Sequence, residues 1–335
     1  MSASHNEIRT EPRPNCFLCG SAGKSLYQDL PSALFETPGR WSFSQCPRSE
    51  CGLVWINPTP VEADLYRAYE NYFTHGGDNA GKRSGTSWRA VLYAGYRAMN
   101  HPGWVIAGIA REKARRARMF LDDFKPGKLL DVGCGDGKFL SEMQALGWAV
   151  DGIDFDAKAV QSAKQKYGLS LRHGDLRSAG LPSANFDTVT MSHVIEHVTD
   201  PVGLLTEIKR VLSAGGQLVI TTPNIESLGH RKFGSCWFGI DAPRHLNLFS
   251  AKSLSDVALR AGFEIVNVGS TAASADVFIG ASYTMQEKQG HRMGHQPTPS
   301  VLRTFKAVWW QYREHFAVRR DPVCGEELMA QCGKK

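Results

Sequence analysis

Short apolar runs alternate with longer stretches of mixed polarity through the middle of the chain, between residues 128 and 222. The short runs have the length and composition of buried strands, and the stretches between them repeat their apolar positions at helical spacing. Strands that alternate with helices form a parallel sheet with helices on both faces. We therefore expect a doubly wound α/β fold, with strands at 128–132, 148–153, 169–173, 186–191 and 217–222 and helices at 138–146, 157–167 and 202–212.

The pattern changes on both sides of this run. Residues 61–124 are predicted to be mostly helical, with amphipathic helices at 88–99 and 105–124. On the other side, the pattern predicts an irregular segment at 223–249, a helix at 253–261, a strand at 263–270 and a helix at 302–315. Residues 271–300 have no clear period, and the Gly, Pro, Gln and His residues at 289–299 favour a surface loop.

The most specific motif is KLLDVGCGDG at residues 128–137. Asp131 lies at the end of the first predicted strand, and Gly133, Gly135 and Gly137 follow at alternate positions. Glycines directly after a parallel strand let the backbone turn tightly and approach a ligand at the start of the next helix. The spacing is G-x-G-x-G, which differs from the G-x-G-x-x-G fingerprint of dinucleotide-binding domains.

Two more strands end in acidic residues. Asp154 follows the second strand, where α/β nucleotide-binding folds place the carboxylate that binds a ribose diol. Asp175 follows the third strand. Together with the glycine motif, this order resembles the class I S-adenosylmethionine (SAM)-dependent methyltransferases. The resemblance implies a SAM site formed by Asp131, Gly133, Cys134, Gly135, Gly137, Asp154, Phe155, Asp175, Leu176, Ser192 and His193.

Several of these residues have a second interpretation. Asp175 is expected at the adenine amino group, but an aspartate in a turn also caps backbone N–H groups. Phe155 fits either the adenine face or the hydrophobic core. His193 is close to the expected backbone contacts to the SAM amino group, so it serves either as a base or as a cap of the SAM site.

The resemblance also implies the rest of the architecture. The run GEELMAQCGK near residue 330 corresponds to the last strand of the family, which pairs antiparallel at the sheet edge. It would complete a mostly parallel sheet of seven strands. The expected division is a zinc-ribbon-like domain at 15–58, a helical connector or cap at 61–124, a SAM-binding domain at 125–270 and a C-terminal extension at 271–335.

Four of the eight cysteines form two closely spaced pairs, Cys16-x-x-Cys19 and Cys46-x4-Cys51. Four thiolates on two short loops give a closed tetrahedral zinc site, which is structural because no position remains for water. A small β domain built around such an ion lacks the core to fold unaided. The alternative is that the four thiols are free and buried.

Three histidines are candidates for a general base. His193 and His197 flank Glu196 in SHVIEH, and His245 lies in WFGIDAPRHLNLFS, a stretch similar to a signature of ubiquinone-type and sugar-modifying bacterial methyltransferases. An imidazole that titrates near neutrality can remove a proton from a hydroxyl or an acidic carbon as the methyl group arrives. His245 and His197 are therefore the expected catalytic residues. The alternative that neither histidine is essential stays open.

These motifs predict a SAM-dependent methyltransferase that acts on an oxygen or carbon of a small molecule, such as a sugar, a polyketide or a quinone. One alternative is a zinc-ribbon RNA methyltransferase. It is disfavoured because SHVIEH replaces the Asn/Asp-Pro-Pro-aromatic motif of base amino-methylases and because the ribbon is not basic. Another alternative is a non-catalytic module that keeps a SAM-like fold to bind a partner.

Composition adds few constraints. The 335 residues are 42% hydrophobic and 21% charged, as in ordinary globular proteins, with a net charge of +6. The N-terminus is polar and the apolar runs are too short to span a bilayer, so a cytoplasmic location is expected. The basic residues of 111–118 form either a solvated helix face or a surface for an acidic substrate or a membrane. The pattern leaves the oligomeric state open.

Overall fold

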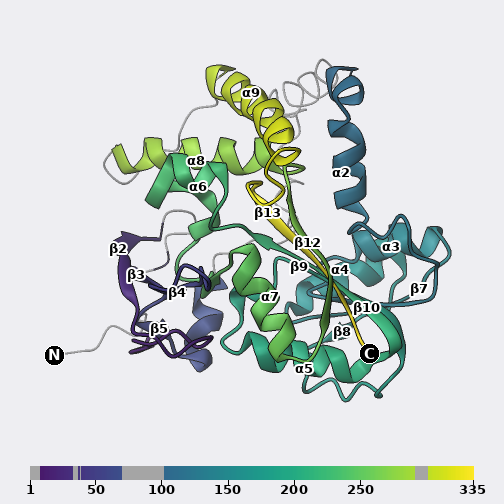
Figure 1. Ribbon diagram of the computed structural model, residues 1–335. Helices are drawn as coiled ribbons and strands as arrows, with labels where there is room; N and C mark the ends of the chain where they lie inside the picture. Colours follow the sequence, from purple (N-terminus) through teal and green to yellow (C-terminus); the bar gives the residue numbers. More distant parts are fainter. Residues whose placement is uncertain (1–7, 33–36, 38, 70–101, 291–300) are drawn as a thin grey trace.

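The computed structural model describes residues 8–32, 37, 39–69, 102–290 and 301–335. Within these residues, a seven-stranded sheet forms the centre of the molecule (Figure 1). Its strands, in spatial order, are β12 (Glu264–Thr271), β13 (Glu327–Gly333), β10 (Leu212–Pro223), β9 (Phe186–Ser192), β6 (Lys128–Val132), β7 (Ala149–Asp154) and β8 (Arg172–His173). The strands from β10 to β8 are parallel, as the alternating pattern predicts.

Helices cover both faces of this sheet. On one face, α3 (Lys138–Ala145) and α4 (Ala157–Tyr167) pack around Leu129 of β6. On the other face, α5 (Pro201–Val211) and α7 (Ala251–Arg260) pack around Leu130, the next residue of the same strand. Successive residues of a strand point to opposite faces, so the two leucines enter two separate core clusters. The predicted doubly wound α/β fold is confirmed.

The position of β13 differs from the prediction. The strand is antiparallel to its neighbours, as expected, but it lies between β10 and β12 and not at the sheet edge. Leu328, Ala330 and Cys332 are fully buried, which suits a strand with a neighbour on each side. The edge strand on this side is β12.

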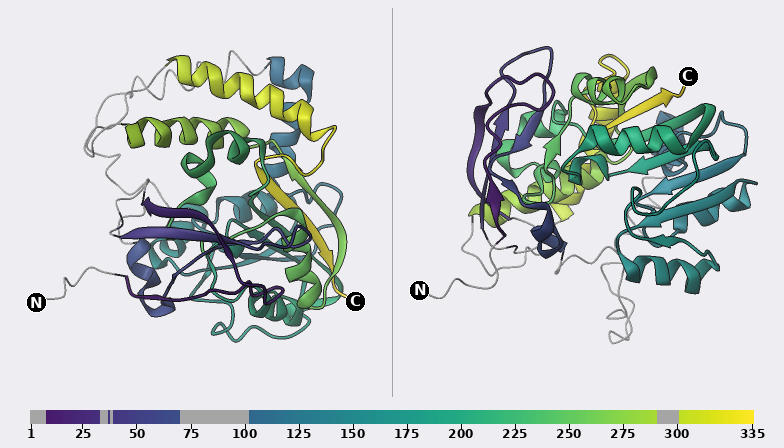
Figure 2. Two further views of the ribbon diagram at one scale, coloured as in Figure 1. Left: turned by 60° about the vertical axis from the view of Figure 1, so that its left-hand side comes forward. Right: turned by 90° about the horizontal axis from the view of Figure 1, so that it is seen from below.

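A second sheet connects the N-terminal segment to the main domain. Its order is β11 (Asn247–Leu248), β4 (Val54–Ile56), β3 (Arg40–Gln45) and β2 (Lys24–Pro31), with every pair antiparallel. Strand β11 comes from the segment predicted as irregular, so the main domain supplies one strand of the N-terminal sheet. A separate pair joins β1 (Thr10–Glu11) to β5 (Thr59–Pro60). Figure 2 shows the N-terminal strands as a layer beside the main domain.

The predicted connector is helical only in part. Among its described residues, it contains a 3-10 helix, η1 (Glu62–Tyr69), a helical segment at 102–107 and α2 (Ile109–Ala117). The predicted continuous helix at 105–124 is wrong, because Gly108, Met119 and Phe120 adopt left-handed backbone conformations that interrupt and end it. The predicted helix at 88–99 lies outside the described residues.

The C-terminal part contains two long helices, α8 (Ala275–Gly290) and α9 (Val301–Val318), which pack against each other above the sheet (Figure 1). The short helical turns after β10 are α6 (Leu228–Phe233), η4 (Gly234–Cys236) and η5 (Phe238–Ile240). None of the helices in the described ranges has the length and apolar character needed to cross a bilayer.

Candidate active site

The predicted SAM-binding residues follow the carboxyl ends of four neighbouring parallel strands, β8, β7, β6 and β9. Parallel strands end at the same edge of a sheet, which is where α/β domains bind ligands. Backbone hydrogen bonds join these ends: the Gly133 N–H donates to the Ile153 carbonyl (2.8 Å), and the Gly174 N–H donates to the Asp154 carbonyl (2.9 Å). The four strand ends therefore form one continuous polar edge.

The glycine loop after β6 needs its glycines for two reasons. Gly133, Gly135 and Gly137 have φ angles of 76°, 54° and 73°, a left-handed conformation that other residues rarely adopt. A Cβ atom on Gly133 would also lie 2.3 Å from the Val194 side chain. This sequence of conformations turns the chain from β6 into α3 and leaves room for a ligand to approach the loop backbone.

Asp154 is tied directly to this loop. Its buried carboxylate accepts hydrogen bonds from the backbone N–H of Gly135 (2.8 Å) and of Asp156 (2.9 Å), one on each oxygen. A carboxylate oxygen has more than one acceptor position, so both oxygens can still bind hydroxyl groups. The next residue, Phe155, exposes 58% of its surface beside this carboxylate and is therefore not a core aromatic.

The side chains of Asp131 and Cys134 are more deeply buried than direct contact with a ligand requires. Asp131 is buried and accepts a hydrogen bond from the Thr190 hydroxyl (2.7 Å), and burial raises its pKa to about 7. Cys134 is also buried, with its side chain packed against Gly152. Both side chains therefore support the loop from inside the sheet.

Asp175 lies on the surface and caps a turn. Its carboxylate accepts hydrogen bonds from the Ser178 hydroxyl (2.6 Å) and from the backbone N–H of Ser178 and Arg177. The bonds from Ser178 lower the Asp175 pKa. Leu176 is buried. The contacts that Asp175 makes within the chain are thus those of an aspartate that caps a turn, which is the second interpretation given for it above.

A network of ion pairs surrounds the end of β9. His193 donates Nδ1–H to Glu196 (3.1 Å) and Nε2–H to Glu327 (2.7 Å). Glu327 also pairs with Arg116 (2.7 Å), whose guanidinium donates to the Ser192 hydroxyl (3.0 Å). Burial acts to lower the His193 pKa, but the two carboxylates raise it to about 9. His193 is therefore an imidazolium with both nitrogens occupied, which disqualifies it as a base at neutral pH.

The two predicted catalytic histidines lie together. The ring centres of His197 and His245 are 4.7 Å apart. His245 Nδ1 donates to the Gly239 carbonyl (2.7 Å), and His197 Nδ1 donates to the Arg244 carbonyl (3.0 Å). These bonds fix the tautomer of each ring and leave each Nε2 as the nitrogen that can accept a proton.

The protonation of this pair is set by burial. Burial lowers the pKa of His245 to about 4, and burial together with the neighbouring His245 ring lowers that of His197 to about 4. Both rings are therefore neutral near pH 7, and the titration near neutrality expected of a general base is not found for either ring. Burial opposes ionisation of Glu196, but the His193 imidazolium lowers its pKa to about 2, so a carboxylate stands close to both neutral rings.

Tyr69 connects the histidine pair to the predicted cofactor residues. Its hydroxyl is 2.9 Å from His197 Nδ1, and its ring lies edge-on to Phe155 with 5.3 Å between ring centres. Residues from η1, β7, η3 (Ile195–His197) and the segment before β11 thus meet at one place.

Sequence reasoning missed Tyr69, Arg116 and Glu327 as members of this site. Glu327 is 134 positions from its partner His193, and no local pattern relates the two. Arg116 was recognised only as one of a run of basic residues. A weak signal for Glu327 was available, because a charged residue at the start of an apolar strand needs a buried partner.

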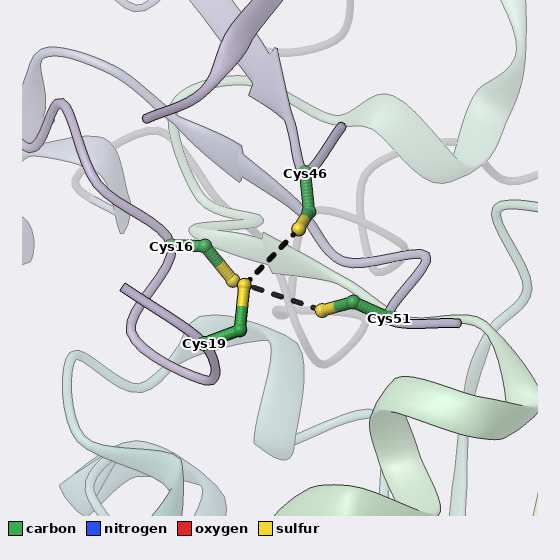
Figure 3. A group of neighbouring side chains, drawn as sticks. All are labelled: Cys16, Cys19, Cys46 and Cys51. Atoms are coloured by element: carbon green, nitrogen blue, oxygen red, sulfur yellow. Dashed lines mark hydrogen bonds between the residues drawn. The ribbon is translucent and has the colours of Figure 1, made fainter. Parts of the chain in front are cut away.

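The four clustered cysteines come together in the N-terminal region (Figure 3). The Sγ atoms of Cys16 and Cys51 are 3.7 Å apart, and those of Cys19 and Cys46 are 3.3 Å apart. These distances are too long for disulfides. Four sulfurs at 2.3 Å from a tetrahedral zinc ion would be separated by about 3.8 Å. The chemistry and spacing of the donors thus fit zinc.

Part of the chain is similar to known proteins. Residues 107–268 match the family described as "Methyltransferase domain". A probable S-adenosylmethionine-dependent methyltransferase of Mycolicibacterium smegmatis is 31% identical over 141 residues, which cover 41% of this chain and 52% of that protein. A SAM-dependent methyltransferase structure from Archaeoglobus fulgidus is 18% identical with a TM-score of 0.44, and the likeness covers 68% of this chain and 94% of that one.

Two further relatives have more specific names. A ubiquinone biosynthesis O-methyltransferase of Cereibacter sphaeroides is 34% identical over 106 residues, covering 30% of this chain and 43% of that protein. A malonyl-[acyl-carrier protein] O-methyltransferase of Erwinia billingiae is 30% identical over 123 residues, covering 36% and 48%. The chain thus spans about half the length of the relatives it matches.

Proposed function

Because residues 107–268 belong to the methyltransferase-domain family, we propose that this chain transfers a methyl group from SAM to an oxygen or carbon of a small molecule. The observation that carries the proposal is the bond between the glycine loop and Asp154, which brings backbone N–H groups and a carboxylate to one edge of the sheet. SAM presents complementary groups there, a ribose diol for the carboxylate and an amino-acid end for the loop.

We propose that the other residues of this edge contact the remaining parts of SAM or support the glycine loop. Phe155 packs against the adenine, and Asp175 and Leu176 line its far side, where Asp175 can accept from the amino group. Ser192 and His193 face the amino-acid end of SAM. Asp131 and Cys134 hold the glycine loop in place. The methyl group of SAM is already a strong electrophile, so the protein's task is to place the acceptor atom in line with it.

We further infer that His245 accepts the proton of the acceptor. Its Nε2 is unprotonated at neutral pH, and its Nδ1–H is held by the Gly239 carbonyl. Protonation in a buried site needs nearby negative charge, which Glu196 and Asp241 supply; the Asp241 carboxylate lies 3.8 Å from His245 Nε2. His197 assists by orienting the acceptor and is the alternative base.

His245→Gln tests this role. Glutamine can still donate to the Gly239 carbonyl but cannot take up a proton, so we expect turnover to fall by about 10²- to 10⁴-fold. SAM affinity, measured by calorimetry, should stay at the wild-type value and shows that the variant is folded. Turnover close to wild type would remove His245 from the mechanism.

The acceptor is proposed to be a metabolite that carries a hydroxyl or an acidic C–H group, such as a sugar, a polyketide or a quinone. Two relatives are named as a ubiquinone biosynthesis O-methyltransferase and a malonyl-[acyl-carrier protein] O-methyltransferase, and these names support oxygen as the acceptor atom. Tritiated SAM incubated with metabolite extract and with an RNA pool separates this proposal from an RNA methyltransferase. Absence of SAM binding would instead indicate a non-catalytic module.

We also propose that Cys16, Cys19, Cys46 and Cys51 bind a structural zinc ion. With all four positions taken by thiolates, the ion would have no place for water or substrate and would contribute to folding only. Metal analysis of Cys19→Ser should show loss of zinc. Cys236→Ser, a buried cysteine outside the cluster, is the matched control and should keep it.

A further inference from the structure

Helix α9 exposes large apolar side chains along one face. Leu302, Phe305, Trp309 and Phe316 follow one another at spacings of three, four and seven residues, which places them on a single side of the helix. Between 47% and 63% of each is exposed. The opposite side of the helix, which includes Trp310, is buried. A contiguous exposed apolar stripe of this kind is uncommon and marks a surface that contacts something apolar.

The polar residues that flank the stripe are all basic. They are Lys306, Arg313, Arg319 and Arg320, whereas Glu314, the one acidic residue between 302 and 320, is buried. A further basic residue, Arg303, is largely covered and pairs with Glu287 (2.7 Å). The Arg313 guanidinium lies 5.7 Å from the Trp309 ring centre, and that of Arg319 lies 5.2 Å from the Phe316 ring centre. Arginine side chains that run over aromatic rings keep their charge at the rim of an apolar surface.

The stripe continues onto a second helical segment. Ile106 exposes 89% of its surface, and with Tyr312, Phe316 and Arg319 it lines a hollow of about 440 Å³. His315 Nε2 and Arg319 both donate to the Ala107 carbonyl (2.9 Å each), so the two segments are fixed side by side. Both lie at the same end of the molecule, at the top of Figure 1.

We propose that this surface, formed by Ile106, Leu302, Phe305, Lys306, Trp309 and Phe316 and named here the α9 face, binds to an anionic membrane surface. A bilayer offers acyl chains directly below a layer of negative headgroups, which is complementary to aromatic residues rimmed by cations. A second copy of the chain is a poor occupant because two basic faces repel each other. The proposal does not depend on methyl transfer.

The test is flotation of the full chain with two kinds of vesicle, phosphatidylcholine alone and phosphatidylcholine mixed with phosphatidylglycerol. We expect the chain to float with the mixed vesicles only, and added NaCl to weaken the association. The double variant Phe305→Ser/Trp309→Ser should lose about tenfold in partitioning for each aromatic removed. Lys306→Gln should lose about fivefold.

The matched control is Leu259→Ser/Val266→Ser, which removes two equally exposed apolar residues from α7 and β12 and should leave flotation unchanged. SAM affinity, measured in parallel, reports that each variant is folded. Absence of flotation with the mixed vesicles, or equal flotation of the aromatic double variant, would overturn the proposal. Two other results would also overturn it. One is self-association of the chain that the aromatic double variant abolishes. The other is retention on an acidic polypeptide, without flotation, that the same variant abolishes.

Discussion

At the scale of single residues, Asp154 is the side chain on which proposed SAM binding depends most. Replacing it with asparagine removes the charge that strengthens hydrogen bonds from a ribose diol. We expect Asp154→Asn to bind SAM on the order of 10- to 100-fold more weakly in calorimetry. Asp151→Asn is the control, because Asp151 lies on the same strand but pairs with Arg172 (3.1 Å). Equal losses in both variants would show that the effect is not local to the site.

Three histidines of the candidate site make stability depend on pH in two directions. His193 has a pKa raised from 6.5 to about 9, so its contribution is complete below pH 6.5 and is lost as the pH rises toward 9. His197 and His245 have pKa values lowered from 6.5 to about 4, so their contribution is complete above pH 6.5 and is lost as the pH falls toward 4.

We therefore expect the combined contribution of these three histidines to the free energy of unfolding, measured by urea denaturation of the wild type and variants, to be greatest near pH 6.5. His193→Gln should remove the decline on the alkaline side without changing the acid side. A wild-type profile that is flat between pH 6.5 and 9 would contradict the assignment of His193 as a doubly paired imidazolium.

At the scale of elements, the start of α5 shows how a few residues position the site. Asp200 accepts a hydrogen bond from the Gly203 N–H (2.9 Å) and Pro201 occupies the first turn. Asp200→Ala should lower the free energy of unfolding by about 1 kcal/mol through loss of the cap. Arg177→Ala breaks the exposed Arg177–Asp200 pair but keeps the cap, and should change stability by less than about 0.5 kcal/mol.

The elements that the sequence predicts well are those with a clear period. Most strands and helices between 128 and 222 are found near their expected bounds because each buries one regular face or run. Two strands differ: β8 is limited to Arg172–His173, and β10 begins at Leu212. Helix α8 was missed because its apolar residues lie on all sides and its period is correspondingly weak. Strand β11 was missed because two residues are too short for any pattern, and only pairing with β4 defines it.

The candidate site also contains residues that the sequence predicts and residues that it does not. Asp154 and the glycine loop were predictable because neighbouring strands bring them together in a way that depends only on chain order. The network around His193 was not, because its partner Glu327, and Arg116, which pairs with Glu327, come from elements far away in the sequence. The location of β13 between β10 and β12 decides where Glu327 lies, and no local signal specified that order.

At the scale of the whole molecule, the segment that carries the cysteine cluster is bonded to the main domain and shares its buried core. Besides the β4–β11 pair, the Ser250 hydroxyl at the start of α7 donates to the Cys51 carbonyl (3.3 Å), and Arg260 at its end donates to the Leu18 carbonyl. Leu18, Leu53 and Trp55 lie in the same buried cluster as residues of α5 and α7. The domain boundary predicted at residue 58 therefore crosses a continuous core.

A consequence is that removing the proposed zinc ion should destabilise more than the N-terminal segment. We expect a zinc chelator to lower the melting temperature of the entire chain by at least about 10 °C in a single transition. Differential scanning calorimetry measures it, and Cys236→Ser without chelator is the reference. Two separate transitions, with the larger one unmoved by the chelator, would show that the two regions unfold independently.

The central position of β13 bears on how the polypeptide is made. During translation, β10 and β12 emerge well before the strand that belongs between them, since α8 and α9 are synthesised first. Until then, two strands present open backbone groups to the surroundings, a configuration that invites pairing with other nascent chains. Ribosomal stalling between β12 and β13 would consequently yield aggregation-prone fragments that also lack the carboxylate of Glu327.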